Sequence, residues 1–191
     1  AQGLADPAVG GIVVTHGTDT LEETAFFLHS VLAGSKPVVL TCAMRPASAL
    51  SPDGPQNVRD AIAVAATPGA RGVSVVCAGV VHGAMDVQKV HTYRLDAFDS
   101  GDGGPLGFVE EGRVRQTRPW PAVGPGVAAV HSWPQDIDPP RVEIVFSHAG
   151  ARSTLIDSLV DQRADGEAKA VRGLVLAATG NGTLHREIEQ A

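Results

Sequence analysis

The chain has 191 residues, of which 43% are hydrophobic and 19% are charged, so it can bury a substantial core. Its formal net charge of −6, with no cluster of Lys and Arg, argues against a nucleic-acid groove or an anionic membrane surface as its partner. No apolar run approaches the roughly 20 residues that a membrane-spanning helix needs.

The first predicted elements are a short strand and an amphipathic helix. Residues 12–14 are apolar and β-branched, which predicts a strand buried on both faces. Thr20-Leu21-Glu22-Glu23 fits a capping box, so we expect a helix over residues 21–32. Its apolar face would consist of Leu21, Ala25, Leu28 and Leu32.

The same alternation of strand and helix continues over the next 60 residues. It predicts strands at 38–41, 73–77 and around 80–82, and a helix over 57–66 with Val58, Ile62 and Ala65 or Ala66 on its buried stripe. This βαβ order predicts an α/β fold with an open, mostly parallel, flavodoxin-like sheet flanked by helices. Cys42 and Cys77 each close an apolar run, so we expect two buried free thiols rather than a disulfide.

Six prolines interrupt residues 119–140, which predicts a linker between a first domain at 1–118 and a second at 141–191. The βαβ pattern resumes with strands at 142–146 and 174–177 around a helix at about 154–163. Gly180-Asn181-Gly182 predicts a turn, after which Thr183 would cap a last helix. We expect this to be only the beginning of a smaller α/β C-terminal domain, because so few elements cannot close a core. The expectation is therefore that the chain is part of a longer protein, and its cellular compartment stays open.

The turn after the first strand is the best candidate for a functional site. Thr18 and Asp19 would lie at the carboxyl end of a strand, where open α/β sheets build their ligand crevices. Thr and Asp are also ordinary turn and cap residues, so the chemistry of the turn alone leaves both interpretations open. A Thr hydroxyl needs a basic partner, for which Lys89 is the candidate, although its spacing alone is typical of a solvated surface charge.

A resemblance to a known family shifts this balance. The segment Gly11-Ile12-Val13-Val14-Thr15-His16-Gly17-Thr18-Asp19-Thr20-Leu21-Glu22-Glu23-Thr24-Ala25 resembles the second signature of the bacterial-type L-asparaginases. The likeness continues in family order through Ala43-Met44-Arg45-Pro46, Asp53-Gly54-Pro55-Gln56-Asn57, Asp86-Val87-Gln88-Lys89 and Gly180-Asn181-Gly182. Met44-Arg45-Pro46 and Glu22-Glu23-Thr24 are more similar to the type II branch than to type I.

The resemblance implies a function and a site. The family hydrolyses the side-chain amide of L-asparagine, and in some cases L-glutamine, to the acid and ammonia without a cofactor. Its catalytic Thr, Asp and Lys fall on Thr18, Asp19 and Lys89, with Thr18 and Asp19 also binding the substrate. Asn181 and Thr183 match a turn that reaches the site of a neighbouring subunit in the family's homotetramers, although Thr replaces the more usual Asn or Ser at position 183.

The family's first signature, a strand followed by Thr-Gly-Gly-Thr whose first threonine is acylated, does not occur in these 191 residues. We therefore expect the chain by itself to be inactive. Two alternatives stay open, namely a non-catalytic asparaginase-like module for amino-acid binding or assembly, and the asparaginase-like subunit of a tRNA amidotransferase. The acidic charge disfavours the second alternative.

Other chemistries find little support in the sequence. The seven histidines show neither His-x-His nor His-Glu-x-x-His spacing, so no metal site is predicted. His16 belongs to the signature, where positioning the turn is a better interpretation than proton transfer. Asp86 is expected to support a turn rather than to act directly.

Overall fold

The computed structural model describes residues 2–121, 139–164 and 170–191 and divides the chain into two compact units, Ala1–Trp133 and Pro134–Ala191. Most of the linker predicted at 119–140 lies outside the described residues, and the predicted domain boundaries stay predictions. Within the described ranges, no helix is both long and apolar enough to cross a bilayer.

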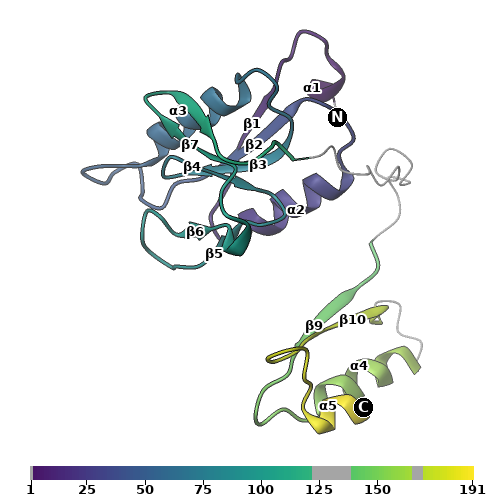
Figure 1. Ribbon diagram of the computed structural model, residues 1–191. Coiled ribbons are helices and arrows are strands. Elements are labelled where there is room, and N and C mark those ends of the chain that lie inside the picture. The colour runs from purple at the N-terminus through teal and green to yellow at the C-terminus, as the bar shows by residue number, and fades with distance from the viewer. Residues whose placement is uncertain (1, 122–138, 165–169) are drawn as a thin grey trace. The chain divides into compact units, whose positions relative to one another are not determined.

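The first unit is built on a six-stranded sheet with the order β1-β2-β3-β4-β7-β8 (Figure 1). Strands β1, β2 and β3 pair in parallel, and β4, β7 and β8 extend the sheet by antiparallel pairing. The sheet strands are β1 (Ile12–Thr15), β2 (Pro37–Thr41), β3 (Gly72–Cys77), β4 (Val80–Gly83), β7 (Gly107–Glu110) and β8 (Arg113–Gln116). The other elements are α1 (Gln2–Ala5), α2 (Leu21–Val31), α3 (Gly54–Ala65), the short hairpin β5 (Gln88–Lys89) with β6 (Phe98–Asp99), and the 3-10 turn η1 (Gly101–Gly103).

Helices α2 and α3 cover opposite faces of the parallel strands (Figure 1). Alternate residues of a strand point to opposite faces, and β2 is buried along its whole length. Val38 and Leu40 therefore pack with Leu21 and Ala25 of α2, whereas Val39 packs with the α3 side. This arrangement confirms the predicted α/β fold with an open sheet flanked by helices.

Two sequence predictions about burial differ from the structure. Strand β1 is only half-buried at residues 12–14, because it is the edge strand of this sheet among the described residues. On α3 the buried face is formed by Asn57, Asp60, Ala61 and Val64, and Ile62 is 55% exposed. The predicted stripe is therefore wrong at Ile62, whereas Val58 is half-buried and Ala65 packs against the core. Asn57 lies in the interior instead because its amide finds three polar partners there.

Helices α2 and α4 (Thr154–Ala164) begin where they were predicted, but α3 begins three residues earlier, at Gly54, and the predicted caps of α2 and of the last helix are wrong. Helix α2 begins at Leu21 as predicted, yet the Thr20 side chain makes no capping hydrogen bond. The last helix, α5 (Arg186–Gln190), is capped by His185, whose Nδ1 accepts from the Glu187 backbone N–H at 3.3 Å. Thr183 instead closes the preceding turn through its backbone, so its predicted capping role is wrong.

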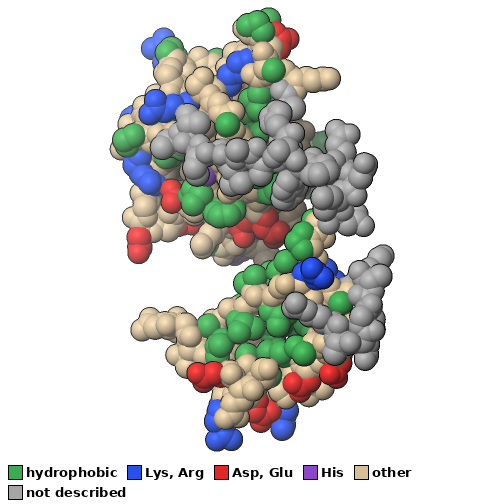
Figure 2. Space-filling model, turned by 90° about the vertical axis from the view of Figure 1, so that its right-hand side faces the viewer, with side chains coloured by type: hydrophobic (Ala, Val, Ile, Leu, Met, Phe, Trp, Pro, Cys, Tyr) green, Lys and Arg blue, Asp and Glu red, His purple; other side chains and the backbone are tan. Residues whose placement is uncertain are grey.

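The second unit has the order β9 (Val142–Phe146), α4 (Thr154–Ala164), β10 (Gly173–Ala177) and α5. Strands β9 and β10 pair in parallel, as the βαβ pattern predicts. The helices cover the face that carries Val145, and the core also contains Ile156, Leu159 and Ile188. Figure 2 shows apolar side chains gathered on the surface of this unit, where Val142, Ile144, Phe146 and Val175 are each at least 51% exposed.

Candidate active site

The turn that follows β1 is held in place by His16. Its backbone N–H donates to the Thr41 carbonyl of β2 at 2.9 Å, which ties the start of the turn to the sheet. Its ring contacts the Gly17 carbonyl through Nδ1 at 2.7 Å and the Thr24 hydroxyl through Nε2 at 3.0 Å. A carbonyl only accepts, so Nδ1 carries the proton, and in the neutral ring Nε2 accepts from Thr24. These contacts are those of a residue that positions the turn, as the sequence predicts.

Lys89 reaches the same turn from the β5–β6 hairpin. Lys89 pairs with Phe98 in that hairpin, and Phe98 is buried in the core cluster on the α2 face. The backbone N–H of Lys89 donates to the carboxylate of Glu22 in the first turn of α2. The hairpin is thus fixed by the buried Phe98 side chain and by the hydrogen bond to Glu22. Both lie close to the turn after β1 that carries Thr18 and Asp19, which we call the Thr18 turn.

The structure brings the three predicted residues together. Lys89 Nζ donates to Thr18 Oγ1 at 2.9 Å and to Asp19 Oδ1 at 2.9 Å. The Thr18 hydroxyl in turn donates to Asp19 Oδ1 at 3.4 Å. The Lys89 side chain is 19% exposed, whereas that of Asp19 is 93% exposed. The ammonium is therefore partly withdrawn from water, and the carboxylate is open to a ligand.

The charge of Lys89 controls the ionisation of its acidic neighbour. The hydrogen bond from Lys89, followed by its positive charge, lowers the pKa of the Asp19 carboxyl below the ordinary value of 3.8. Asp19 therefore stays anionic throughout the neutral range. A fixed exposed anion beside a hydroxyl is a suitable receptor for a small ligand that carries an ammonium group.

A cavity of about 210 Å³ adjoins the turn at the carboxyl ends of β1 and β2. It is lined by Thr15 and His16 on one side, by Thr41 and Cys42 on the other, and by the start of α3. Open space beside the Thr18 turn is therefore present at the edge of the sheet where open α/β folds bind ligands.

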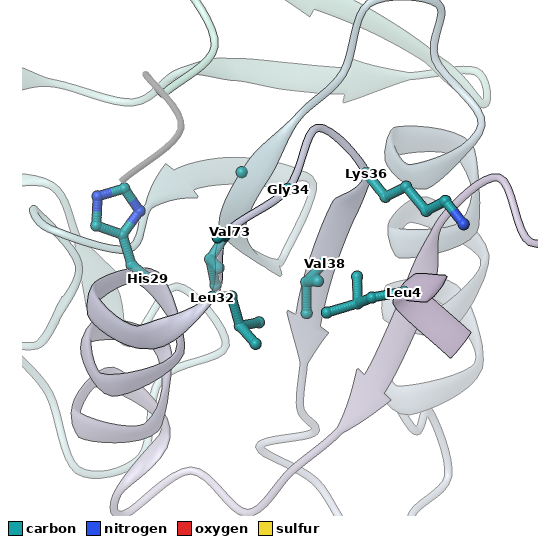
Figure 3. Close-up of a pocket in the computed structure, with 9 residues that line it drawn as sticks. Leu4, His29, Leu32, Gly34, Lys36, Val38 and Val73 are labelled. Carbon is teal, nitrogen blue, oxygen red and sulfur yellow. The ribbon is translucent and has the colours of Figure 1, made fainter. Parts of the chain in front are cut away.

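The pocket in Figure 3 is a different feature. It is lined by Leu32 at the end of α2 together with Val38 and Val73, which lie near the amino ends of their strands. Its volume of about 10 Å³ leaves room for no more than a single water molecule. It thus lies at the opposite end of the strands from the Thr18 turn and is too small for a substrate.

The remaining predicted site residues, Asn181 and Thr183, lie in the second unit. Thr179 and Thr183 exchange backbone hydrogen bonds of 3.0 and 2.8 Å across the Gly180-Asn181-Gly182 turn. Gly180 and Gly182 have positive φ angles, which favour glycine, and Asn181 is exposed at the tip. Their role at a partner's site stays a prediction.

Two acidic residues acquire clear structural roles. Asp86 pairs with Arg118 at 2.9 Å and supports a turn through its backbone, consistent with its expected supporting role. Glu22 was interpreted in the sequence as part of a capping box, and its contact with the Lys89 backbone was not predicted. Within residues 2–121, 139–164 and 170–191, no three His, Cys, Asp or Glu side chains are grouped as a metal site would need.

Comparison with known proteins identifies the family of this chain. A family model described as the asparaginase N-terminal domain matches residues 1–121. The chain belongs to the asparaginase family. L-asparaginase 2 of Escherichia coli is 37% identical over 184 residues, which cover 93% of this chain and 49% of that protein. A glutaminase-asparaginase of Pseudomonas fluorescens is 37% identical over 197 residues, covering 98% of this chain and 50% of that protein.

The fold likeness extends to a solved structure of a family member. The crystal structure of a probable cytoplasmic L-asparaginase from Campylobacter jejuni superimposes with a TM-score of 0.82 at 33% identity. The match covers 95% of this chain and 56% of that one. The chain thus spans about half the length of the relatives that it matches.

Proposed function

We propose that the protein containing this chain hydrolyses the side-chain amide of L-asparagine to L-aspartate and ammonia. The observation that carries the proposal is that Lys89 Nζ lies 2.9 Å from both Thr18 Oγ1 and Asp19 Oδ1. An alcohol, an amine and a carboxylate in mutual contact form a recognised arrangement for moving a proton to or from a hydroxyl. Family membership supports this assignment.

In this proposal each residue of the cluster has a distinct role. In its amine form Lys89 takes the proton of the Thr18 hydroxyl, which faces the amide that is cleaved, and as the ammonium seen in the structure it returns that proton. Asp19 binds the α-ammonium group of the substrate through its exposed carboxylate. The reaction passes through an acyl-enzyme on a threonine of the Thr-Gly-Gly-Thr type, a segment that these 191 residues do not contain.

The decisive test is the release of ammonia from L-asparagine by the purified protein that contains this chain. We expect turnover in the wild type and a loss of about 10²- to 10⁴-fold in kcat for Lys89→Met, the range typical of a lost acid–base group. Lys36→Met is the matched control, because Lys36 donates to the Asp6 carbonyl and touches no residue of the cluster. Wild-type turnover in Lys89→Met would refute the proposed role of the lysine.

The same assay separates the alternatives. We expect the 191-residue chain by itself to release no ammonia. Binding of L-asparagine without turnover by the protein that contains it would favour a non-catalytic binding module. Turnover only in the presence of charged tRNA would favour an amidotransferase subunit, which the net charge of −6 disfavours.

We also propose L-glutamine as a secondary substrate and a homotetramer as the assembly of the protein that contains this chain. The glutaminase-asparaginase among the relatives supports the first point. Competition between the two amides in the ammonia assay tests it. Light scattering tests the assembly, and a monomer with full activity would contradict the expected contribution of Asn181 and Thr183 to a neighbouring site.

A further inference from the structure

Two buried thiols meet at the carboxyl ends of β2 and β3. Thr41 pairs with Val76 in the register of these parallel strands, so Cys42 and Cys77 are the next pair along. Both cysteines are free, and they are 5% and 2% exposed. Cys42 donates its S–H to Cys77 Sγ at a sulfur–sulfur distance of 3.7 Å. The structure thus holds the two sulfurs in contact but not bonded.

The second thiol connects this pair to the hairpin that carries Lys89. Cys77 donates its S–H to the Leu95 carbonyl at 3.7 Å. Leu95 lies in the loop between β5 and β6, and the buried core around the cysteines includes Val87 and Phe98 at the base of the same hairpin. The reduced pair therefore tethers the Lys89 hairpin to the sheet.

We propose that Cys42 and Cys77 are an oxidative modification site, at which a hydroperoxide converts the two thiols into an intramolecular disulfide and thereby releases the Leu95 tether. Adjacent strands lie about 4.7–4.9 Å apart, which is within the Cα separation of about 4.4–6.8 Å that disulfides require. Side-chain rotation then has only to bring the sulfurs from 3.7 Å to a bonded distance of about 2.05 Å.

The two thiols are not equivalent, and their difference sets the order of the steps. The hydrogen bond between the two thiols lowers the pKa of the Cys42 thiol. The same neighbour, together with burial, raises the pKa of the Cys77 thiol far above its ordinary value. Cys42 also lines the cavity of about 210 Å³ beside the turn that carries Thr18, so it is the thiol that a hydroperoxide reaches and, as the thiolate, the attacking sulfur.

The reaction balances with one hydroperoxide per pair. The Cys42 thiolate attacks one peroxide oxygen, the O–O bond breaks, and a sulfenic acid forms while the other oxygen leaves as an alcohol or as water. Cys77 then attacks the sulfenic sulfur, the S–O bond breaks, and the oxygen leaves as water with the Cys77 proton. The two sulfurs are oxidised and the peroxide is reduced. The burial of both thiols favours a hydroperoxide over a bulky disulfide such as oxidised glutathione.

Oxidation removes the donor that holds the hairpin, because a disulfide has no S–H group. Hydrogen exchange of the amides in residues 88–99 should therefore become about three- to tenfold faster in the oxidised protein, as expected for one lost hydrogen bond. Oxidation should also reduce ammonia release, and this expectation rests on the proposed function because it requires Lys89 to be catalytic. Disulfide formation and the faster hydrogen exchange do not depend on the proposed function.

The experiment treats the protein that contains this chain with hydrogen peroxide and maps its peptides without reduction. A linked pair of peptides carrying Cys42 and Cys77, about 2 Da lighter than their sum, is expected and should revert with dithiothreitol. Cys42→Ser and Cys77→Ser are matched controls that cannot form the pair, and Cys42→Ala is a second variant should serine unfold the core. The exchange of residues 88–99 is measured on the same samples.

The outcomes decide each part separately. Linked peptides with faster exchange, absent from the serine variants, support the proposal. The absence of linked peptides after a dose that oxidises the methionines overturns it. Linked peptides without a change in hydrogen exchange would show that the hydrogen bond from Cys77 to Leu95 does not hold the hairpin. Neither readout uses L-asparagine, so a failure here is distinct from a failure of the proposed function.

Discussion

Glu22 accepts a hydrogen bond from the backbone N–H of Lys89, although 67 positions separate the two residues in the chain. Glu22 stands in the first turn of α2, directly behind Thr18 and Asp19, and Lys89 stands in a hairpin of two-residue strands. Such a short hairpin has few backbone hydrogen bonds of its own. The carboxylate therefore sets the position from which the ammonium reaches the Thr18 hydroxyl.

Replacement of Glu22 should accordingly impair catalysis without touching the cluster itself. Glu22→Ala is expected to lower kcat for ammonia release by about 10- to 100-fold, because small displacements of catalytic groups have effects of this size. Glu22→Gln keeps an acceptor oxygen and should recover part of the loss. Glu23→Ala is the control, since Glu23 is the exposed neighbour in the same turn. Equal effects of Glu22→Ala and Glu23→Ala would show that the carboxylate does not position Lys89.

Asp19→Asn should act mainly on substrate affinity. A neutral amide cannot replace the charge-assisted contact with an α-ammonium group, so KM for L-asparagine is expected to rise about 10- to 100-fold. Asp102→Asn, a change at an exposed aspartate in η1, should leave KM unaltered. Steady-state kinetics give both constants. An unchanged KM with a reduced kcat would mean that the Asp19 carboxylate orients Lys89 and does not bind the ammonium group of the substrate.

The sequence predicted the parallel part of the fold well because its signals are local. Residues 38–41 and 73–77 are continuous apolar runs, and they form β2 and β3 with shifts of one residue at an end. Strands β7 and β8 were missed. They are joined by Glu111-Gly112, where both residues have positive φ angles, and this pair is a less obvious hairpin turn than Asn-Gly.

In the candidate site, too, some features follow from the local sequence and others depend on tertiary contacts. The placement of Thr18 and Asp19 in a strand-to-helix turn follows from the residues on either side. The contact of Lys89 with that turn does not, because it depends on a two-residue strand and on the Glu22 contact. Lys89 was a candidate basic partner on chemical grounds, but its spacing alone was typical of a solvated surface charge, and the family resemblance was needed to favour it. The buried side chain of Asn57 was also unpredictable, since its partners at Cys42 and Ala78 come from two other loops.

His82 should make the stability of the fold depend on pH. Burial lowers the pKa of its imidazole from 6.5 to about 4, with the charge of Asp99 opposing part of the shift, and Nδ1 pairs with the Ser100 hydroxyl at 2.7 Å. Between these two pKa values the unfolded chain binds a proton that the folded chain does not. Stability is therefore expected to fall as the pH drops from 6.5 towards 4, by up to roughly 3 kcal/mol.

Urea unfolding at several pH values measures this effect, with His82→Gln as the variant that removes the titrating group. The carboxylates of Asp19, Asp53 and Glu110 have lowered pKa values, so their contributions are lost only at more acidic pH. The slope between pH 6.5 and 5 should thus be shallower in His82→Gln than in the wild type. The same slope in both proteins would mean that His82 is not responsible.

Gly11 and Gly10 offer a matched pair for testing how tightly β1 packs. A Cβ at Gly11 would lie 2.9 Å from the Ala65 carbonyl oxygen, 3.0 Å from Pro37 Cγ and 3.2 Å from Ala65 Cβ. A Cβ at Gly10 would meet no atom within 4 Å. Because the atoms around Gly11 belong to the end of α3 and the start of β2, they cannot yield without displacing those elements.

Gly11→Ala should therefore lower the free energy of unfolding by about 1–3 kcal/mol, the usual cost of overpacking. Gly10→Ala should be close to neutral, or stabilising by up to about 1 kcal/mol through a less flexible unfolded chain. Urea midpoints of the two variants provide the comparison. Equal tolerance of both substitutions would mean that the chain at the start of β1 lies farther from α3 than in the structure. The turn that carries Thr18 would then be less firmly supported by β1.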